Sequence, residues 1–217
     1  EFTSTSPLAA ARKLCTFAPT DDSAVGMLNF ASPKKAGGAW LSGADDQEAT
    51  VVRHSTLIDS LQNSHAGTQF YAAHRVESDG SGLHDHAMLY SPHVAVFKDD
   101  RGRNISPYTI DVVSSVPVNA ETVRSKFNID EEDKQNGIRT VMKERMARIL
   151  CLFEDRGDKM LVLGAFGVGQ FCNSPDMIGE IWADLLGAKE AKFKGVFEKV
   201  VFAVPGKHLL SFENSFN

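Results

Sequence analysis

MLVLGAFGVG, residues 160–169, is the stretch that decides the fold class of this chain. Its first four residues form a continuously apolar run of strand length, and three glycines follow within the next six residues. Pro175 lies in the first turn of the helix that comes next, with Asn173 or Ser174 as its cap. Upstream, residues 130–153 have apolar side chains at helical spacing and acidic residues in the first turn. A buried strand between amphipathic helices is typical of an α/β sheet covered on both faces.

The same alternation extends through the rest of the chain. Further strands are predicted at residues 25–30, 87–90, 94–97, 110–116 and 200–204, and further helices at residues 7–15 and 47–61. The two strands on either side of Ser91-Pro92 are short and irregular, which indicates a mixed sheet rather than an all-parallel one. We therefore predict an α/β fold with three layers, α/β/α, and a mixed central sheet.

The composition is that of an ordinary globular protein. Of the 217 residues, 42% are hydrophobic and 24% are charged, which suits a single domain over residues 3–217. Glu1 and Phe2 are interpreted as a cloning remnant, because no Met precedes them, and they are left out of the fold prediction. A net charge of −5 argues against a broad nucleic-acid-binding surface.

Nothing in the sequence points to a membrane or to a metal. No apolar run approaches the roughly 18 residues of a membrane span, and no secretion signal is recognised. The three scattered cysteines, Cys15, Cys151 and Cys172, are expected to be buried thiols in a reducing intracellular compartment, cytoplasmic or nuclear. His84-Asp85-His86 is expected to be a polar loop rather than a metal site, because adjacent side chains of a strand point to opposite faces.

Two glycine-bearing loops are the candidate binding elements, and each follows a predicted buried strand. They comprise residues 33–40 and residues 164–171. A glycine-rich turn between a strand and a helix directs several backbone N–H groups at one anion. Neither loop matches the dinucleotide fingerprint or the phosphate loop of nucleotide triphosphatases. Two such loops in one domain favour a ligand with a diphosphate, although either could be an ordinary tight turn.

Other catalytic patterns are absent or weak. No Gly-x-Ser-x-Gly elbow presents a nucleophile. The carboxylates of Asp45-Asp46 and Asp99-Asp100 are predicted to be solvated. Lys34-Lys35 either meet a phosphate or form a solvated pair, and the second interpretation is favoured.

Residues 28–48, LNFASPKKAGGAWLSGADDQE, resemble the signature of microbial-type poly(ADP-ribose) glycohydrolases, in which a Gly-Gly-Gly loop precedes a Gln-Glu-Glu motif at a helix start. The resemblance continues through residues 53–57, 89–100, 162–173 and 200–203. It implies a macrodomain-like fold that binds ADP-ribose and poly(ADP-ribose) on modified proteins, with no cofactor. No nucleic-acid or membrane partner is expected, and the oligomeric state is left open, with a monomer favoured.

The resemblance also implies which residues bind the ligand. The diphosphate is expected within Gly164, Ala165, Phe166, Gly167, Val168, Gly169, Gln170 and Phe171, with Phe171 packed on a ribose. The terminal ribose is expected beside Asn29, Phe30, Ala31, Gly37, Gly38 and Ala39. Gln47 and Glu48 are expected to fix ribose hydroxyls.

Position 49 is where the chain departs from the family pattern. The family's second glutamate protonates the leaving oxygen of the ribose–ribose bond, and this chain has Ala49 there. Ala39, in place of the third loop glycine, is expected to be a mild change. Ala49 is either a deliberate substitution that silences a glycosidase, which we favour, or the mark of a natural ADP-ribose reader. An unrelated nucleotide-binding α/β domain is a third, less favoured interpretation.

Overall fold

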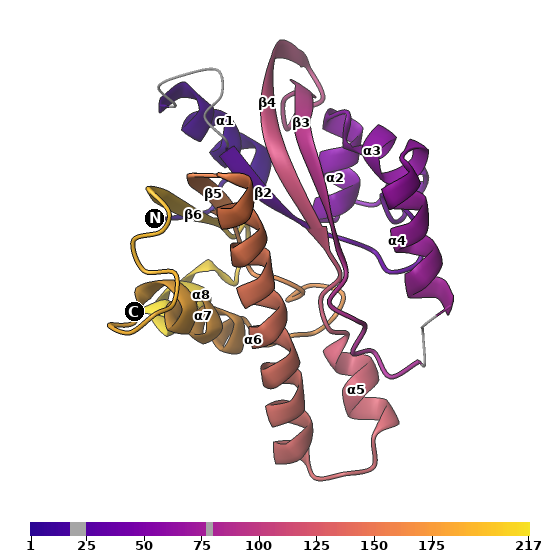
Figure 1. Cartoon of the computed structure of the whole chain (residues 1–217), viewed down its shortest axis with the longest axis vertical. Coiled ribbons are helices and arrows are strands. Elements are labelled where there is room, and N and C mark those ends of the chain that lie inside the picture. The colour runs from indigo at the N-terminus through magenta and orange to yellow at the C-terminus, as the bar shows by residue number, and fades with distance from the viewer. Residues whose placement is uncertain (18–24, 77–79) are drawn as a thin grey trace.

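The computed structural model describes residues 1–17, 25–76 and 80–217 of the chain. Within these ranges the strands form one six-stranded sheet in the order β1-β6-β5-β2-β4-β3 (Figure 1). Their bounds are β1 Phe2–Thr3, β2 Val25–Phe30, β3 Met88–Lys98, β4 Asn104–Ser115, β5 Met160–Leu163 and β6 Lys199–Ala203. Strand β3 runs antiparallel to β4, and the other paired strands are parallel. The predicted mixed sheet is confirmed.

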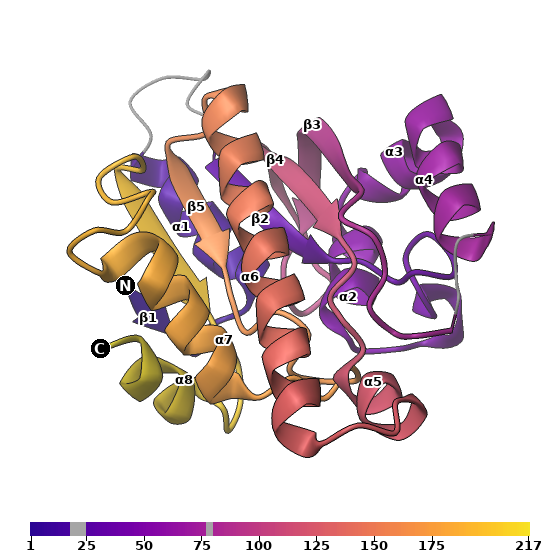
Figure 2. The same ribbon diagram turned by 60° about the horizontal axis from the view of Figure 1, so that its bottom comes forward.

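Helices cover both faces of this sheet (Figures 1 and 2). One face carries α1 Pro7–Phe17, α2 Gln47–His54, α3 Leu57–Asn63 and α4 His65–Val76, and the other carries α5 Ala120–Lys126, α6 Glu131–Arg156, α7 Pro175–Trp182 and α8 Leu209–Phe216. Because neighbouring strand residues point to opposite faces, Val112 packs in the cluster under α1 and α2, while Val113 packs in the one under α6 and α7. The predicted three layers are confirmed.

Helix α6 follows the sequence prediction closely. Its apolar stripe, including Ile138, Met146 and Phe153, is fully buried against the sheet. The helix ends at Gly157, whose φ of 84° lies in the left-handed region that glycine adopts without strain. The local signals and the tertiary packing agree here, so the helix bounds could be predicted.

The predicted helix over residues 47–61 is wrong in one respect, because the chain breaks it at Ser55. The Ser55 hydroxyl donates to the Val51 carbonyl, and Ser55 forms an isolated bridge with Val96 of β3. The Thr56 backbone N–H then donates to the Ala95 carbonyl at 2.9 Å. These contacts with β3 end α2 and separate it from α3.

The two short strands predicted around Ser91-Pro92 are one strand, β3, with a register shift between Ser91 and Val94. His93 within the shift has φ 53°, and its N–H donates to Asp111 Oδ1 at 2.7 Å. Bulges of this kind keep a strand paired while they bend it. The sequence prediction also omitted β1, α4, α5 and α8.

Several smaller expectations are also corrected. Phe2, left out of the prediction, pairs with Phe202 in the sheet and stacks on its ring at 5.2 Å between centroids. The cysteines are free but not buried, because Cys15 and Cys151 are half-buried and Cys172 is exposed. Among the described residues, no helix is both long enough and apolar enough to cross a membrane.

Strands β2 and β5 separate before the carboxyl end of the sheet. Their pairing ends at Met27 and Val162, whereas β2 continues along β4 as far as Phe30 and Ser115. From there the chain leads from β2 to α2 on one face and from β5 to α7 on the other. Open α/β sheets bind their ligands where connections leave toward opposite faces, so the fold places a site at this opening.

Candidate functional site

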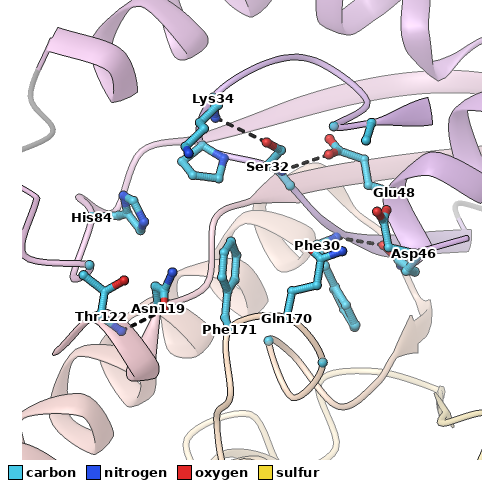
Figure 3. Close-up of a pocket in the computed structure, with 18 of the residues that line it drawn as sticks. Phe30, Ser32, Lys34, Asp46, Glu48, His84, Asn119, Thr122, Gln170 and Phe171 are labelled. Carbon is cyan, nitrogen blue, oxygen red and sulfur yellow. Dashed lines mark hydrogen bonds between the residues drawn. The ribbon is translucent and has the colours of Figure 1, made fainter. Parts of the chain in front are cut away.

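A pocket of about 680 Å³ lies at this opening, between the two glycine-bearing loops (Figure 3). The segment from the end of β2 through the first loop to the start of α2 contributes Phe30, Ala31, Ser32, Pro33, Lys34, Lys35, Gly38, Ala39, Asp46, Gln47 and Glu48. The second loop contributes Ala165, Gly167, Gly169, Gln170 and Phe171, and the opposite wall consists of Gly80, Gly82, His84, Asn119 and Thr122. The structure thus brings the two predicted loops together around one cavity.

Both glycines of the first loop adopt a positive φ, and they differ in what surrounds them. Gly37 has φ 72°, and a Cβ there would lie 2.6 Å from Cδ1 of Trp40, so the position demands glycine. Gly38 has φ 56° and lies on the pocket wall. Ala39 has φ −98° and ψ 27°, which any residue adopts. The third glycine of the family motif is therefore not required by the backbone here.

The second loop contains three glycines with three environments. A Cβ at Gly164 would lie 2.7 Å from the Ala203 carbonyl oxygen, so this glycine lets the loop pack against β6. Gly167 has φ 74°, and its carbonyl accepts from the Asn173 side-chain amide, which also donates to Val118. A Cβ at Gly169 would meet no atom within 4 Å. Gly169 faces open pocket space.

The Gln47 side chain is held by β2, at the part of that strand where β5 no longer pairs with it. Its side-chain oxygen accepts from the Phe30 N–H at 2.9 Å, and its amide nitrogen donates to the Leu28 carbonyl at 2.7 Å. The side chain therefore replaces the hydrogen bonds that a neighbouring strand would supply. The residue also lines the pocket, as expected.

Glu48 is a buried carboxyl on the pocket wall, only 2% exposed. Its Oε2 accepts from the Ser32 N–H at 2.9 Å, and its Oε1 accepts from the Asn29 amide at 3.3 Å and the Tyr71 hydroxyl at 3.4 Å. Burial raises the pKa of Glu48 to about 7, although the Ser32 and Asn29 hydrogen bonds oppose that shift. Such a carboxyl can accept from ligand hydroxyls or exchange a proton near neutral pH.

Ala49 and Asp46 differ from what the sequence suggested. Ala49 is fully buried and is not among the residues that line the pocket. Asp46, expected to be solvated, caps α2 by accepting from the Ala49 N–H at 2.9 Å and lies on the pocket wall. The residue before a helix is a common capping position for aspartate, so this signal was present in the sequence.

A second pocket, of about 350 Å³, adjoins the first. The two share Phe30, Gln47, Ala165 and Gly169. Apart from these, the second pocket is mostly apolar, with a few polar groups: its lining is Ser6, Pro7, Leu8, Asp45, Thr50, Val51, Val168, Ala203, Val204, Pro205 and His208. The two adjoining pockets therefore place a mostly apolar lining beside one that carries more polar groups, a combination typical of small-ligand sites.

Comparison with known proteins identifies the family. A family model described as "Microbial-type PARG, catalytic domain" matches residues 1–99. The structure is similar to a glutamate-to-alanine mutant of poly(ADP-ribose) glycohydrolase from Thermomonospora curvata, with 37% identity and a TM-score of 0.88 over 99% of this chain and 78% of that one. The chain belongs to the microbial-type poly(ADP-ribose) glycohydrolase family.

Other solved glycohydrolases agree with this assignment. The T. curvata enzyme bound to the inhibitor ADP-HPD is 37% identical, with a TM-score of 0.87 over 99% of this chain and 77% of that one. The enzyme from Deinococcus radiodurans in complex with ADP-ribose is 34% identical, with a TM-score of 0.87 over 100% of this chain and 83% of that one. A comparison with curated protein sequences found no match. The homology confirms the macrodomain-like fold and a glycosidase-type enzyme.

Not every residue that the glycohydrolase resemblance implied lies on the pocket surface. Asn29 is fully buried and reaches the site through its bond to Glu48, and Phe166 is fully buried beneath Phe30 at 5.4 Å between ring centroids. Val168 lines the smaller pocket. Gly37 and Gly164 belong to neither lining and shape the loops from behind.

The glycohydrolase pocket also includes residues that sequence reasoning missed. His84, Asn119 and Thr122 form its opposite wall, and Tyr71 supports Glu48 from α4. Asn119 caps α5 by accepting from the Thr122 N–H, a local signal that could have been found. No local signal marks His84 or Thr122 as pocket residues, because contacts with segments far away in the chain place them there. Among the described residues, no three His, Cys, Asp or Glu side chains gather in a way that could hold a metal ion.

Replacing Glu48 by glutamine is expected to change the pH dependence of stability. The pKa of Glu48 in the folded chain, about 7, lies above the ordinary value of 4.5. Its contribution to stability is therefore fully present below pH 4.5 and is lost as the pH rises through 7. Between pH 5 and 8, Glu48→Gln should gain about 3 kcal/mol in unfolding free energy relative to the parent.

Urea unfolding at several pH values measures this difference. Asp158, whose pKa burial also raises to about 7, is present in both proteins and cancels. Glu190→Gln, which changes an exposed carboxyl, is the matched control and should follow the parent. Parallel pH curves for the parent and Glu48→Gln would contradict the assignment.

Proposed function

We propose that this chain binds ADP-ribose across the two adjoining pockets. The observation that carries the proposal is their junction, where Gly169 and Ala165 of the second loop line both pockets together with Phe30 at the end of β2 and Gln47 at the start of α2. A diphosphate at this junction would approach the open face of Gly169. The apolar smaller pocket suits an adenine, and the polar larger pocket suits ribose hydroxyls.

The terminal ribose is proposed to lie beside Glu48. Both carboxylate oxygens already accept hydrogen bonds from the protein, which fixes the group as an acceptor facing the pocket. Phe171, on the second loop, stands in the pocket (Figure 3). Its ring is proposed to pack on the same ribose. These roles agree with what the glycohydrolase family implies for Glu48 and Phe171.

The proposed activity is hydrolysis of the ribose–ribose bonds of poly(ADP-ribose) on modified proteins, by a chain with glutamate at position 49. A carboxyl there would protonate the leaving oxygen and then activate water, whereas an alanine methyl does neither. The present chain is therefore proposed to bind without hydrolysing.

A second candidate function, a natural ADP-ribose reader, is favoured by one observation. The Ala49 side chain is completely enclosed, so its surroundings leave no solvent-filled space where a glutamate would stand. A protein that had evolved with alanine at this position would pack in this way.

Titration calorimetry with ADP-ribose tests the proposed binding. We expect one site per chain with micromolar affinity, about 8 kcal/mol, and the same affinity after EDTA treatment because no ligand contact is proposed to involve a metal. Absence of heat and of any thermal shift at millimolar ADP-ribose would refute the proposal. Loss of ADP-ribose binding after EDTA treatment would refute the claim that binding needs no metal.

A further inference from the structure

A cavity of about 560 Å³ lies beside the first loop, and it shares none of its described lining residues with the two adjoining pockets. It lies where the end of α2 and the start of α3 meet β3, the edge strand of the sheet (Figure 1). We call this cavity the rear pocket, and its lining includes Trp40, Arg53, His54, Ile58, Phe97 and Lys98. The start of α2, at Gln47 and Glu48, borders the larger pocket, so one short helix reaches both cavities.

Aromatic rings from two distant segments line the rear pocket. Trp40 belongs to the first loop and Phe97 to the end of β3, and both side chains are half-buried. Ile58 of α3, also half-buried, adds an aliphatic surface. Half-buried aromatic and aliphatic side chains around one cavity favour a ligand with a planar ring.

The rear pocket also carries an available positive charge. Lys98 takes part in no ion pair with another described residue, and its Nζ lies 5.8 Å from the centroid of the Phe97 ring. The one carboxylate among the described lining residues, Asp59, is exposed and accepts from the Asn63 amide at 3.1 Å. Burial lowers the pKa of His54, so its imidazole is neutral at pH 7. A negatively charged ligand group therefore has Lys98 as its partner, next to an aromatic ring.

The first loop connects the rear pocket with the larger pocket. Gly38 and Ala39 line the larger pocket, and Trp40, directly after them, lines the rear one. A Cβ on Gly37 would lie 2.6 Å from Cδ1 of Trp40, so the indole packs on the backbone of the loop. The guanidinium of Arg53 is used to hold the same segment, because Nη1 donates to two of its carbonyls, including that of Trp40 at 3.4 Å. An occupant that holds the Trp40 ring therefore restrains the loop that borders the larger pocket.

We propose that the rear pocket binds a small aromatic carboxylate, with its ring on Trp40 and Phe97 and its carboxylate at Lys98, and that this ligand strengthens ADP-ribose binding through the first loop. The site itself is independent of the proposed function, whereas the coupling rests on it. A restrained loop loses less conformational entropy when ADP-ribose binds. By linkage, each ligand raises the affinity for the other by the same factor.

Two matched probes test the site on the present chain. 1-Naphthylacetate has a planar ring and a carboxylate, and 1-naphthylacetamide replaces the carboxylate by a neutral amide of similar shape. The chain has two tryptophans, so the indole N–H signals in an NMR titration report on Trp40 and on Trp182, which is fully buried and donates to the Gly164 carbonyl. We expect 1-naphthylacetate to shift the Trp40 signal with a Kd of about 1 mM, and the amide to bind about fivefold more weakly. The Trp182 signal should stay in place.

Variants of Lys98 test the partner of the carboxylate. Lys98→Gln should bind the two probes equally, and Lys98→Arg should keep the fivefold preference for the acetate. The matched control is Lys194→Gln, which removes the same charge at an exposed position outside the rear pocket and should behave as the parent does. A Trp40 signal that does not move, equal affinities of the parent for the two probes, or a preference that survives in Lys98→Gln overturns the site.

Calorimetry with ADP-ribose, in the absence and in the presence of saturating 1-naphthylacetate, tests the coupling. We expect about threefold tighter ADP-ribose binding when the probe is present. A probe that shifts the Trp40 signal but leaves ADP-ribose affinity unchanged, or weakens it, overturns the coupling. If ADP-ribose binds neither with nor without the probe, the proposed function is wrong and the coupling with it, while the NMR titration still decides whether the rear pocket is a site.

Discussion

Ala49→Glu is expected to raise the rate of poly(ADP-ribose) hydrolysis by roughly 10²–10⁴-fold over the present chain, which is about 3–5 kcal/mol of activation free energy. Position 49 is in the first turn of α2, directly after Glu48 and within the turn that Asp46 caps. A carboxyl on this turn is the group that the family's chemistry requires. Binding of ADP-ribose should change little, because the loops and Glu48 remain.

Release of ADP-ribose from polymer, at equal protein concentrations, measures the effect. Because Ala49 is fully buried, a larger side chain must displace its neighbours, and Ala49→Gln controls for this. The glutamine variant has the same size as the glutamate variant but no acidic proton, so it should stay inactive. If the parent hydrolyses polymer as fast as Ala49→Glu does, the general acid must be another residue, and Glu48 is the first candidate. Folded Ala49→Glu that binds ligand without hydrolysing polymer would favour the reader function.

Gly169→Val is expected to weaken ADP-ribose binding at least about 100-fold, or about 3 kcal/mol. Gly169 lines both pockets, and its Cβ would project into open space at their junction. Its φ lies outside the left-handed region, so the loss is expected from obstruction of the diphosphate and not from backbone strain. Gly167 differs from Gly169 in this respect, because its φ of 74° lies in the left-handed region.

Calorimetry together with thermal unfolding separates obstruction from misfolding. Gly137→Val is the matched control, because a Cβ there also meets nothing within 4 Å and the site lies on α6, outside both pockets. Both variants should unfold near the parent's temperature, and only Gly169→Val should lose ADP-ribose binding. Parent-like affinity in Gly169→Val would show that the second loop is only a turn.

The elements that could be predicted are those whose local signals agree with their packing. The strand from Met160, the loop from Gly164 and the helix at Pro175 combine an apolar run, glycines and a helix start, and all three are found in place. The break at Ser55 could not be predicted, because the apolar spacing continues across it and only the contact with Val96 ends the helix.

The candidate site likewise has one part that could be predicted from the sequence and one part that could not. Its first loop and Glu48 follow one another in sequence and were found from residue types and from the family resemblance. The opposite wall of the pocket depends on Arg145, whose guanidinium donates to the carbonyls of Leu83 and His84, more than sixty residues away in the chain. Contacts of that kind leave no periodic or compositional trace, so the sequence did not indicate that the loop residue His84 lies on the pocket wall.

The doubly bonded amide of Gln47 has a consequence for the entropy of ligand binding. Only a side chain that donates and accepts at once can satisfy both Leu28 and Phe30, and turning toward a ligand would break both bonds. Residue 47 therefore keeps one rotamer whether the pocket is empty or filled, and so loses no rotational freedom when a ligand enters. The part of the pocket wall that Gln47 forms is therefore ordered before any ligand enters, and it adds no conformational-entropy cost to binding.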